Sequence, residues 1–359
     1  MPRHTFARID GQALVHNYRL ASRLAGDARA MAVVKADGYG HGIGRVARAL
    51  ADEAPCFAVA CIEEAEALRG AGITHPIVLL EGVHSAEDTR RCAMAGFSPV
   101  LHSGYQVDWL LGSGHNAPAF WIKVNTGMNR LGFRPEELPA VMERIQSAPG
   151  VGSVFSGFMT HFACADEMGS DRTERQRDVF VSAVADWPGE ALSAANSAAH
   201  FREGRSLFHW TRPGIMLYGA SPMSGQTGLE LGLMPVMTLE SELIAVRTLQ
   251  PGECVGYGET WQAQEPTPMG IVAIGYGDGY PRHAGTGTPA FINGQRVQLI
   301  GRVSMDMLAV DLSAVPGAKP GDRVELWGPN VSVDEVAQHA GTIGYELLTG
   351  VTARVPRVW

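Results

Sequence analysis

The chain has 359 residues, of which 45% are hydrophobic and 18% are charged, and its formal net charge is −8. This composition is typical of a folded protein with room for two domains, and it excludes a disordered chain. The negative charge and the absence of lysine or arginine runs argue against a nucleic-acid-binding protein, so we expect no nucleic-acid partner.

The sequence also argues against a membrane protein and a disulfide framework. It has no run of about 20 mainly apolar residues, which a membrane-spanning helix needs. Arg3, Arg8 and Asp10 interrupt any apolar stretch near the start, so we expect no signal peptide. The 5 cysteines are scattered and form no CxxC pair, which is typical of reduced thiols. We therefore predict a cytoplasmic protein without a metal site.

In the first part of the chain, short apolar runs alternate with helical patterns. Asp10 is placed to cap a helix that Gly26 ends. Eight apolar runs then follow, and we predict strands at 31–35, 57–61, 76–80, 99–101, 120–124, 154–160, 192–195 and 211–215. Helical patterns between them include 41–54, 63–69, 134–146 and 172–187. This alternation predicts an α/β fold with a (β/α)8 TIM-type barrel, and a doubly wound open sheet is the competing architecture.

The second part of the chain is β-rich. Strands are predicted at 240–248, 269–275, 290–301, 307–312 and 323–327. The dipeptide Asn293-Gly294 indicates a hairpin, and Ser332 with Glu335 resembles a capping box for a helix at 333–339. We place a barrel domain at 8–228 and a mostly antiparallel C-terminal domain at 229–359, with residues 1–7 as a candidate addition to the second.

Lys35 stands at the end of the first apolar run, directly before the glycine-rich segment 36–42. A buried amine loses hydration, which favours its neutral, nucleophilic form and lets it condense with an aldehyde. A lysine that merely extends to solvent from a strand end explains these residues equally well. The residues at the ends of the other predicted strands distinguish between the two interpretations.

Polar residues follow several of the later predicted strands. Arg130 comes after the fifth, His161 after the sixth, Asn196-Ser197 after the seventh, and Arg212 with Gly214-Ile215 belongs to the eighth. Singly, these are readily explained as a core histidine, surface charges or a helix cap. Because the carboxyl ends of barrel strands meet at one mouth, their shared position favours a functional site.

The residue types at this mouth indicate a cofactor with an aldehyde and a phosphate. Backbone amides after Ser197 and around Gly214-Ile215 are suited to cradle a phosphate. No GxxxxGK[ST] or strand-helix GxGxxG motif is present, so a nucleotide is not indicated. A lysine amine combined with a phosphate cradle is what pyridoxal 5′-phosphate requires.

The chain resembles the alanine racemases, a family of fold-type III pyridoxal-phosphate enzymes, from the first helix to the C-terminus. The motifs are specific in combination: AVVKADGYGHG, KVNTGMNRLGF, THFA, ANSAA, RPGIMLYG, VGYGETW, GYGDGYPR, GRVSMDM and YELLTGVTARVPR. The resemblance implies interconversion of L- and D-alanine. It also implies a barrel domain and a β domain arranged as a head-to-tail homodimer with two shared active sites.

The resemblance assigns two bases to opposite faces of the substrate α-carbon. Lys35 would be the Schiff-base lysine and the base on one face, and Tyr257 of the partner subunit would be the base on the other. Arg212 would face the pyridine nitrogen, with His161 between it and the tyrosine. Lysine and tyrosine both have reference pKa values near 10, so both must be tuned downward. We expect the charges of His161 and Arg212 to lower the pKa of the phenol.

The remaining site residues also follow from the resemblance. The cofactor-binding positions correspond to Tyr39, Asn196, Ser197, Gly214, Ile215 and Tyr345. The substrate positions correspond to Arg130, Met305, Asp306 and Tyr276, the last two at the shared pocket and its entrance. Lys123 matches a lysine that is carbamylated in many members, where the new anion holds Arg130. Ser304 replaces a cysteine of some relatives, which we interpret as neutral.

Two alternatives remain open at this point. One is a racemase of another small amino acid such as serine, or a decarboxylase, on the same fold. Tyr345 and Tyr276 should crowd the pocket, which favours the one-carbon side chain of alanine. The other is a non-catalytic pyridoxal-phosphate carrier, but such proteins resemble the barrel half only, whereas this chain also carries residues 230–359 with Tyr257.

Overall fold

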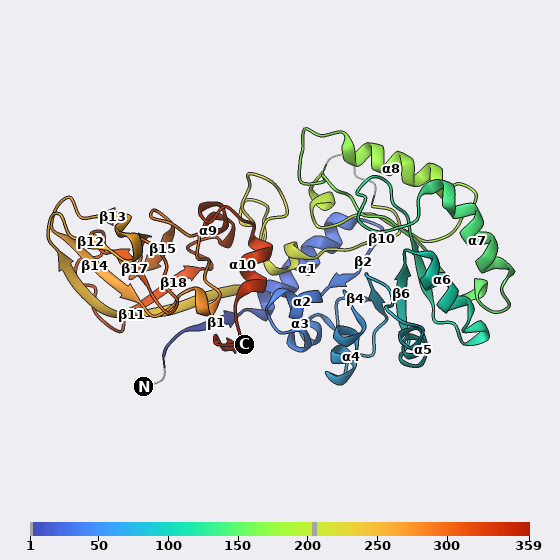
Figure 1. Cartoon of the computed structure of the whole chain (residues 1–359), viewed down its shortest axis with the longest axis horizontal. Coiled ribbons are helices and arrows are strands. Elements are labelled where there is room, and N and C mark those ends of the chain that lie inside the picture. The colour runs from blue at the N-terminus through green and yellow to red at the C-terminus, as the bar shows by residue number, and fades with distance from the viewer. Residues whose placement is uncertain (1–2, 203–206) are drawn as a thin grey trace.

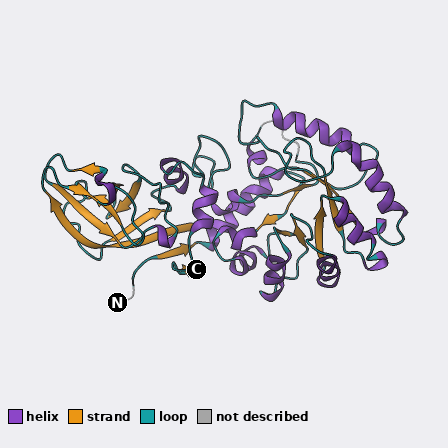
Figure 2. Cartoon of the chain, viewed as in Figure 1, coloured by secondary structure: helices purple, strands orange, loops and turns teal. Residues whose placement is uncertain are grey.

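The computed structural model describes residues 3–202 and 207–359, which form two lobes side by side along the longest axis of the molecule (Figure 1). One lobe consists of parallel strands surrounded by helices, and the other is built mainly of strands (Figure 2). Helix α10 (Gly344–Gly350) lies where the two lobes meet (Figure 1). In the described ranges, no helix combines the length and apolarity needed to cross a bilayer.

The first lobe is a parallel barrel. Its strands, in chain order, are β2 (Arg29–Ala30), β3 (Ala32–Val33), β4 (Phe57–Val59), β5 (Ile77–Leu79), β6 (Phe97–Leu101), β7 (Phe120–Lys123), β8 (Phe155–Met159), β9 (Leu192–Ser193) and β10 (Trp210–Thr211). Met31 separates β2 from β3; β2 pairs with β10 and β3 with β4, so consecutive segments of the chain close the ring. The barrel prediction is therefore confirmed, and the open-sheet alternative is wrong.

Helices surround this barrel (Figure 2). Those of the first lobe are α1 (Gly11–Ala25), the short α2 (Lys35–Tyr39), α3 (Ile43–Leu50), α4 (Ile62–Gly70), α5 (Ala86–Ala95), α6 (Gly104–Leu111), α7 (Leu138–Ser147) and α8 (Arg172–Ala183). The Asp10 side chain caps α1 by accepting from the amides of Gln12 and Ala13, and Gly26 ends it at a φ of 62°, as predicted. A short 3-10 turn, η4 (Ala198–Phe201), follows β9, and another, η5 (Ile215–Tyr218), follows β10.

The second lobe is a mostly antiparallel sheet, as predicted. Its strands are β1 (Phe6–Ile9), β11 (Met237–Leu249), β14 (Thr267–Val272), β15 (Pro289–Ile292), β16 (Gln295–Leu299), β17 (Leu308–Asp311), β18 (Arg323–Trp327) and β19 (Arg357–Val358). A separate ribbon pairs β12 (Cys254–Val255) with β13 (Trp261–Gln262). The predicted hairpin joins β15 to β16, with φ values of 48° at Asn293 and 84° at Gly294.

Two details of this lobe depend on contacts distant in sequence. Strand β1 pairs with β11 and β19, so the start of the chain lies in the second sheet. The helix predicted at 333–339 is α9 (Val333–His339), but its capping box does not form. Ser332 accepts from the Asp334 amide, while Glu335 forms an ion pair with Arg296 instead.

Candidate active site

A cavity of about 910 Å³ lies at the carboxyl ends of the barrel strands and reaches α10. Most of the residues predicted for the site line it: Lys35, Tyr39, Lys123, Arg130, His161, Asn196, Ser197, Arg212, Gly214, Ile215 and Tyr345. These residues come from barrel strand ends and, in the case of Tyr345, from the C-terminal part of the chain. The tertiary fold therefore brings the predicted cationic, hydroxyl and glycine positions into one space.

Lys35 enters this cavity on a left-handed turn. Strand β3 ends at Val33, two residues earlier than predicted, and Ala36, Asp37 and Gly38 have φ values of 53°, 53° and 62°. Left-handed backbone is costly for residues other than glycine, so the surroundings must hold this turn in place. Glu64 helps to do so, because its carboxylate accepts from the Ala36 amide at 2.6 Å.

The Lys35 amine favours its neutral form more than an exposed lysine does. Burial lowers the pKa of Lys35, and the positive charge of Arg130 lowers it further. Among the described residues, no carboxylate forms an ion pair with this amine. Such an amine is suited both to condense with an aldehyde and to accept a proton.

Tyr39 and Gly214 form a close contact on the same side of the cavity. A Cβ atom added to Gly214 would lie 2.4 Å from the Tyr39 hydroxyl oxygen, so only glycine leaves room for it. The Tyr39 ring stacks on Tyr218 at a centroid distance of 4.7 Å and lies 6.2 Å from the Tyr345 ring. Burial raises the pKa of Tyr39 and of Tyr345, so both hydroxyls remain protonated donors.

Ser197 adds a third hydroxyl beside these tyrosines. Its Oγ atom accepts from the Gly214 amide at 2.8 Å. The neighbouring Asn196 side chain has local partners instead, donating to the Phe162 carbonyl and accepting from the Ala199 amide. Hydroxyl donors and a glycine backbone gathered on one wall of a cavity suit an oxyanion such as phosphate.

Arg212 is a buried cation with no carboxylate partner among the described residues. Its guanidinium donates to Ser193 Oγ at 2.5 Å and to the carbonyl oxygens of Thr160 and Ala194 at 2.6 and 3.1 Å. Burial lowers its pKa to about 9, so it still carries its charge at neutral pH. A cation fixed this firmly disfavours protonation of any nitrogen placed opposite it.

His161 is neutral, contrary to the prediction that its charge acts on the tyrosine. Arg212 Nη2 lies 3.2 Å from His161 Nδ1. Burial lowers the pKa of His161 well below its usual 6.5, and the charge of Arg212 contributes further. The imidazole is therefore limited to hydrogen bonding, because a second buried cation beside Arg212 would be strongly disfavoured.

Lys123 ends β7 and is buried near other cations. Its pKa is lowered to about 8, mainly by burial and to a smaller extent by the positive charges of Arg212, Arg130 and Lys35. No carboxylate in the described part of the chain forms an ion pair with it. A carbamate at this nitrogen would place an anion among these positive charges.

Several residues that line the cavity were missed: Glu81, His84, His102, Tyr105, Ile343, Glu346 and Thr349. Glu81 directly follows the predicted strand 76–80, so the rule that selected Lys35 would also have selected it. Ile343, Glu346 and Thr349 had no such signal, because they reach the cavity from around α10 and only the tertiary fold brings them there.

Four predicted residues lie away from this cavity. Tyr257, Tyr276, Met305 and Asp306 belong to the β-rich lobe and do not line it. Tyr257 is 69% exposed and Met305 is 52% exposed, so both lie on the surface of the β-rich lobe. A single chain therefore does not join these residues to Lys35.

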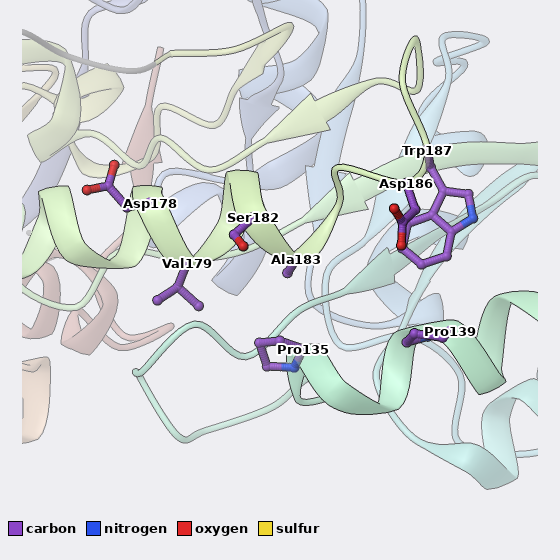
Figure 3. Close-up of a pocket in the computed structure, with 8 residues that line it drawn as sticks. All are labelled: Pro135, Pro139, Asp178, Val179, Ser182, Ala183, Asp186 and Trp187. Carbon is purple, nitrogen blue, oxygen red and sulfur yellow. The ribbon is translucent and has the colours of Figure 1, made fainter.

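A second cavity, of about 510 Å³, lies on the outside of the barrel between α8 and the chain around α7 (Figure 3). Its lining residues are Pro135, Pro139, Asp178, Val179, Ser182, Ala183, Asp186 and Trp187. It has no lysine, arginine or histidine among them, so it does not offer the chemistry of the first cavity.

Comparisons with known proteins cover the whole chain. The family model "Alanine racemase, N-terminal domain" matches residues 9–222, and "Alanine racemase, C-terminal domain" matches residues 236–359. An alanine racemase of Marinobacter nauticus is 65% identical over 358 residues, covering 100% of this chain and 99% of the relative. The biosynthetic alanine racemase of Pseudomonas aeruginosa has a crystal structure that is 47% identical with a TM-score of 0.94, covering 99% of each chain.

A third comparison includes a cofactor. The crystal structure of alanine racemase from Bartonella henselae is described with covalently bound pyridoxal phosphate. It is 31% identical to this chain, with a TM-score of 0.88, and the match covers 99% of each chain.

Proposed function

Since the chain belongs to the alanine racemase family, we propose that it interconverts L- and D-alanine by a two-base mechanism, with pyridoxal 5′-phosphate at Lys35. The observation that carries this proposal is the shared cavity, in which the buried Lys35 amine lies together with the Arg212 cation, which has no carboxylate partner among the described residues. Neither feature is required for the stability of a barrel, because both cost desolvation.

The cofactor fits the donor groups of this cavity. Lys35 would hold its aldehyde carbon, and the hydroxyls of Tyr39, Ser197 and Tyr345 with the backbone at Gly214 and Ile215 would hold its phosphate. Asn196 would support the Ser197 turn through its bond to the Ala199 amide. When bound, pyridoxal phosphate supplies a conjugated electron acceptor that makes the α-proton of alanine removable.

The two bases act on opposite faces of one carbon. The lowered pKa of Lys35 lets its amine accept the α-proton on one face and return it in the reverse direction. The partner's Tyr257 would hold or accept the proton on the other face. Racemisation needs both, because a base that returns the proton to the face it came from regenerates the same enantiomer.

Arg212 and His161 would tune that tyrosine. Since an arginine has no acceptor, the contact between Arg212 and His161 Nδ1 places the imidazole proton on Nε2. The Nε2–H group can then donate to the phenolic oxygen of the partner's Tyr257, which favours the phenolate and lowers the tyrosine pKa. The Arg212 charge acts in the same direction over a longer distance.

Substrate binding would be shared in the same way. Arg130 would bind the alanine carboxylate together with the backbone amide of the partner's Met305. The partner's Asp306 and the partner's Tyr276 would complete the pocket and its entrance, and a carbamate on Lys123 would hold Arg130 in place. Carbamate formation at Lys123 is supported by its pKa of about 8, since only a neutral amine takes up carbon dioxide.

A head-to-tail homodimer follows from this division of the site. Tyr257 and Met305 are exposed on the β-rich lobe of the chain, whereas Lys35 lies in the barrel cavity. Two chains arranged head to tail would place each β-rich lobe against the partner's barrel. Neither a serine racemase nor a non-catalytic carrier is favoured, because the whole chain matches proteins named alanine racemase.

The test combines an absorbance spectrum with a chiral assay on the purified full-length protein. We expect a visible absorption band of lysine-bound cofactor. We also expect L-alanine to be racemised much faster than L-serine or L-arginine. Faster turnover of another amino acid would contradict alanine as the substrate. A bound cofactor without any racemisation would favour the carrier.

A further inference from the structure

A buried carboxylate anchors one of the exposed loops of the β-rich lobe. The Asp278 side chain is 0% exposed. It accepts two hydrogen bonds from Arg3, at 2.5 and 3.0 Å, and one from the Gly275 amide at 3.0 Å. Arg354 Nε lies 3.3 Å from the same carboxylate. A buried anion needs such partners, so this part of the loop is held firmly.

Arg354 connects this loop to a second one. Its Nη2 donates to Asp306 Oδ1 at 2.7 Å, while its Nε faces Asp278. The two loops also touch through their backbones, since the Tyr276 amide donates to the Ser304 carbonyl at 3.1 Å. Two guanidinium groups and two carboxylates, from four separate segments of the chain, therefore form one charge-balanced cluster.

The Arg354 guanidinium lies directly against the first loop. A Cβ atom added to Gly277 would be 2.5 Å from Arg354 Nη1. The Gly277 amide donates to the Met305 carbonyl at 2.8 Å, so this hydrogen bond also fixes the position of the second loop relative to the first. A planar guanidinium reaches both carboxylates at once, whereas the single ammonium of a lysine does not.

The geometry points to Arg354 and Arg3 as positioning residues, which fix the loops that present Tyr276 and the Met305 amide to the partner's cavity. The inference rests on the proposed function, because it is the partner's site that these loops would complete. The Tyr276 and Met305 side chains are 39% and 52% exposed, so their positions depend largely on the backbone beneath them. Small displacements of groups that bind the substrate weaken its binding and so lower kcat/KM.

The first experiment compares Arg354→Ala, Arg354→Lys and Arg3→Ala with a matched control. Arg296→Ala is the control, since Arg296 lies on the same lobe, is 51% exposed against 46% for Arg354, and also forms an ion pair. We expect Arg354→Ala to lower kcat/KM for alanine about tenfold, mainly through KM, as loss of supporting contacts does elsewhere. Arg354→Lys should have the same low kcat/KM as Arg354→Ala. Arg3→Ala should lower kcat/KM less, and Arg296→Ala should leave kcat/KM unchanged.

The second experiment separates action in the partner's site from action in the chain's own site. A heterodimer of one Lys35→Ala chain and one Arg354→Ala chain has one working lysine, and the loops facing that lysine carry an intact Arg354. We expect half of the wild-type kcat with the wild-type KM. In a second heterodimer, one chain carries both substitutions and the other chain is wild type. The working lysine then faces loops that carry Arg354→Ala, so we expect a raised KM.

The reversed pattern, or equal KM values in the two arrangements, would overturn the inference. Loss of stability alone predicts equal values, because both heterodimers carry the same substitutions. The same pair of arrangements with Tyr257→Phe tests the shared site itself. If Tyr257→Phe acts in its own chain, the proposed function fails; if it acts in the partner's site while Arg354→Ala does not, only the positioning role fails.

Discussion

Arg212 Nη2 lies 3.2 Å from Nδ1 of His161, inside a cavity where neither residue forms an ion pair with a carboxylate among the described residues. The guanidinium stays charged at neutral pH, and its charge together with burial keeps the imidazole neutral. Because arginine only donates, this contact also fixes which imidazole nitrogen carries the proton. One buried cation thereby sets the hydrogen-bonding direction of its neighbour.

Replacing Lys35 should remove cofactor attachment and activity together. In Lys35→Ala, we expect the absorbance band of lysine-bound cofactor to disappear and racemisation to fall more than about 10³-fold, since nucleophile and base are lost at once. Lys319→Ala, which changes a lysine of the β-rich lobe, is the control and should retain both. Persistence of either property in Lys35→Ala would show that another amine holds the cofactor.

Replacing Tyr257 should separate proton removal from racemisation. Tyr257→Phe should keep the bound cofactor but lose about 10²- to 10⁴-fold in racemisation, the usual contribution of a positioned acid or base. In deuterated water, the remaining base should still exchange the α-proton of one enantiomer without forming the other. Mass spectrometry of each enantiomer checks this, and exchange into both enantiomers at equal rates would contradict the two-base mechanism.

Adding one methyl group at Gly214 should weaken cofactor binding. In Gly214→Ala, the new Cβ would lie 2.4 Å from the Tyr39 hydroxyl oxygen, so the tyrosine must move. Overpacking of this kind costs about 1–3 kcal/mol, which corresponds to at least a fivefold rise in the Kd of pyridoxal phosphate. Fluorescence titration of the cofactor-depleted protein measures it. Gly285→Ala, where nothing lies within 4 Å of the added atom, should bind normally.

Lys123 should take up carbon dioxide near neutral pH. With a pKa of about 8, roughly a quarter of this amine is neutral at about pH 7.5, far more than for an ordinary lysine. The neutral amine adds carbon dioxide and releases one proton, forming a carbamate. Carbon-13 NMR of protein equilibrated with labelled bicarbonate should show a carbamate signal in the wild type and in Lys319→Gln. Its persistence in Lys123→Gln would assign the carbamate elsewhere.

The buried His41 should make the folded protein sensitive to acid. Burial lowers the pKa of His41 from 6.5 to about 4, so below about pH 6.5 the unfolded chain binds a proton that the folded chain does not. The contribution of His41 to stability is complete above pH 6.5 and is lost as the pH falls towards 4. Between pH 7 and pH 5 this removes about 2 kcal/mol.

Urea unfolding of the wild type and of His41→Gln at both pH values measures this loss. The wild type should lose about 2 kcal/mol more than the variant, because glutamine does not titrate in this range. Equal losses in the two proteins would show that His41 is not responsible.

Local sequence signals predicted the elements that depend on neighbouring residues. Asp10 and Gly26 bound α1 as expected, and Asn293-Gly294 forms the hairpin, since caps and turns are short-range. The capping box at Ser332 failed because a distant partner, Arg296, binds Glu335. A local motif is therefore reliable only where no tertiary contact competes for its side chains.

By itself, the sequence determined the alternation of strands and helices, the position of Lys35 at a strand end and the resemblance that assigns the site residues. Only the tertiary structure decided that β2 and β3 close the barrel, that Ile343, Glu346 and Thr349 reach the cavity, and that His161 is neutral. The reason is physical: periodicity and turn chemistry act over a few residues, whereas burial and charge depend on segments far apart in the chain.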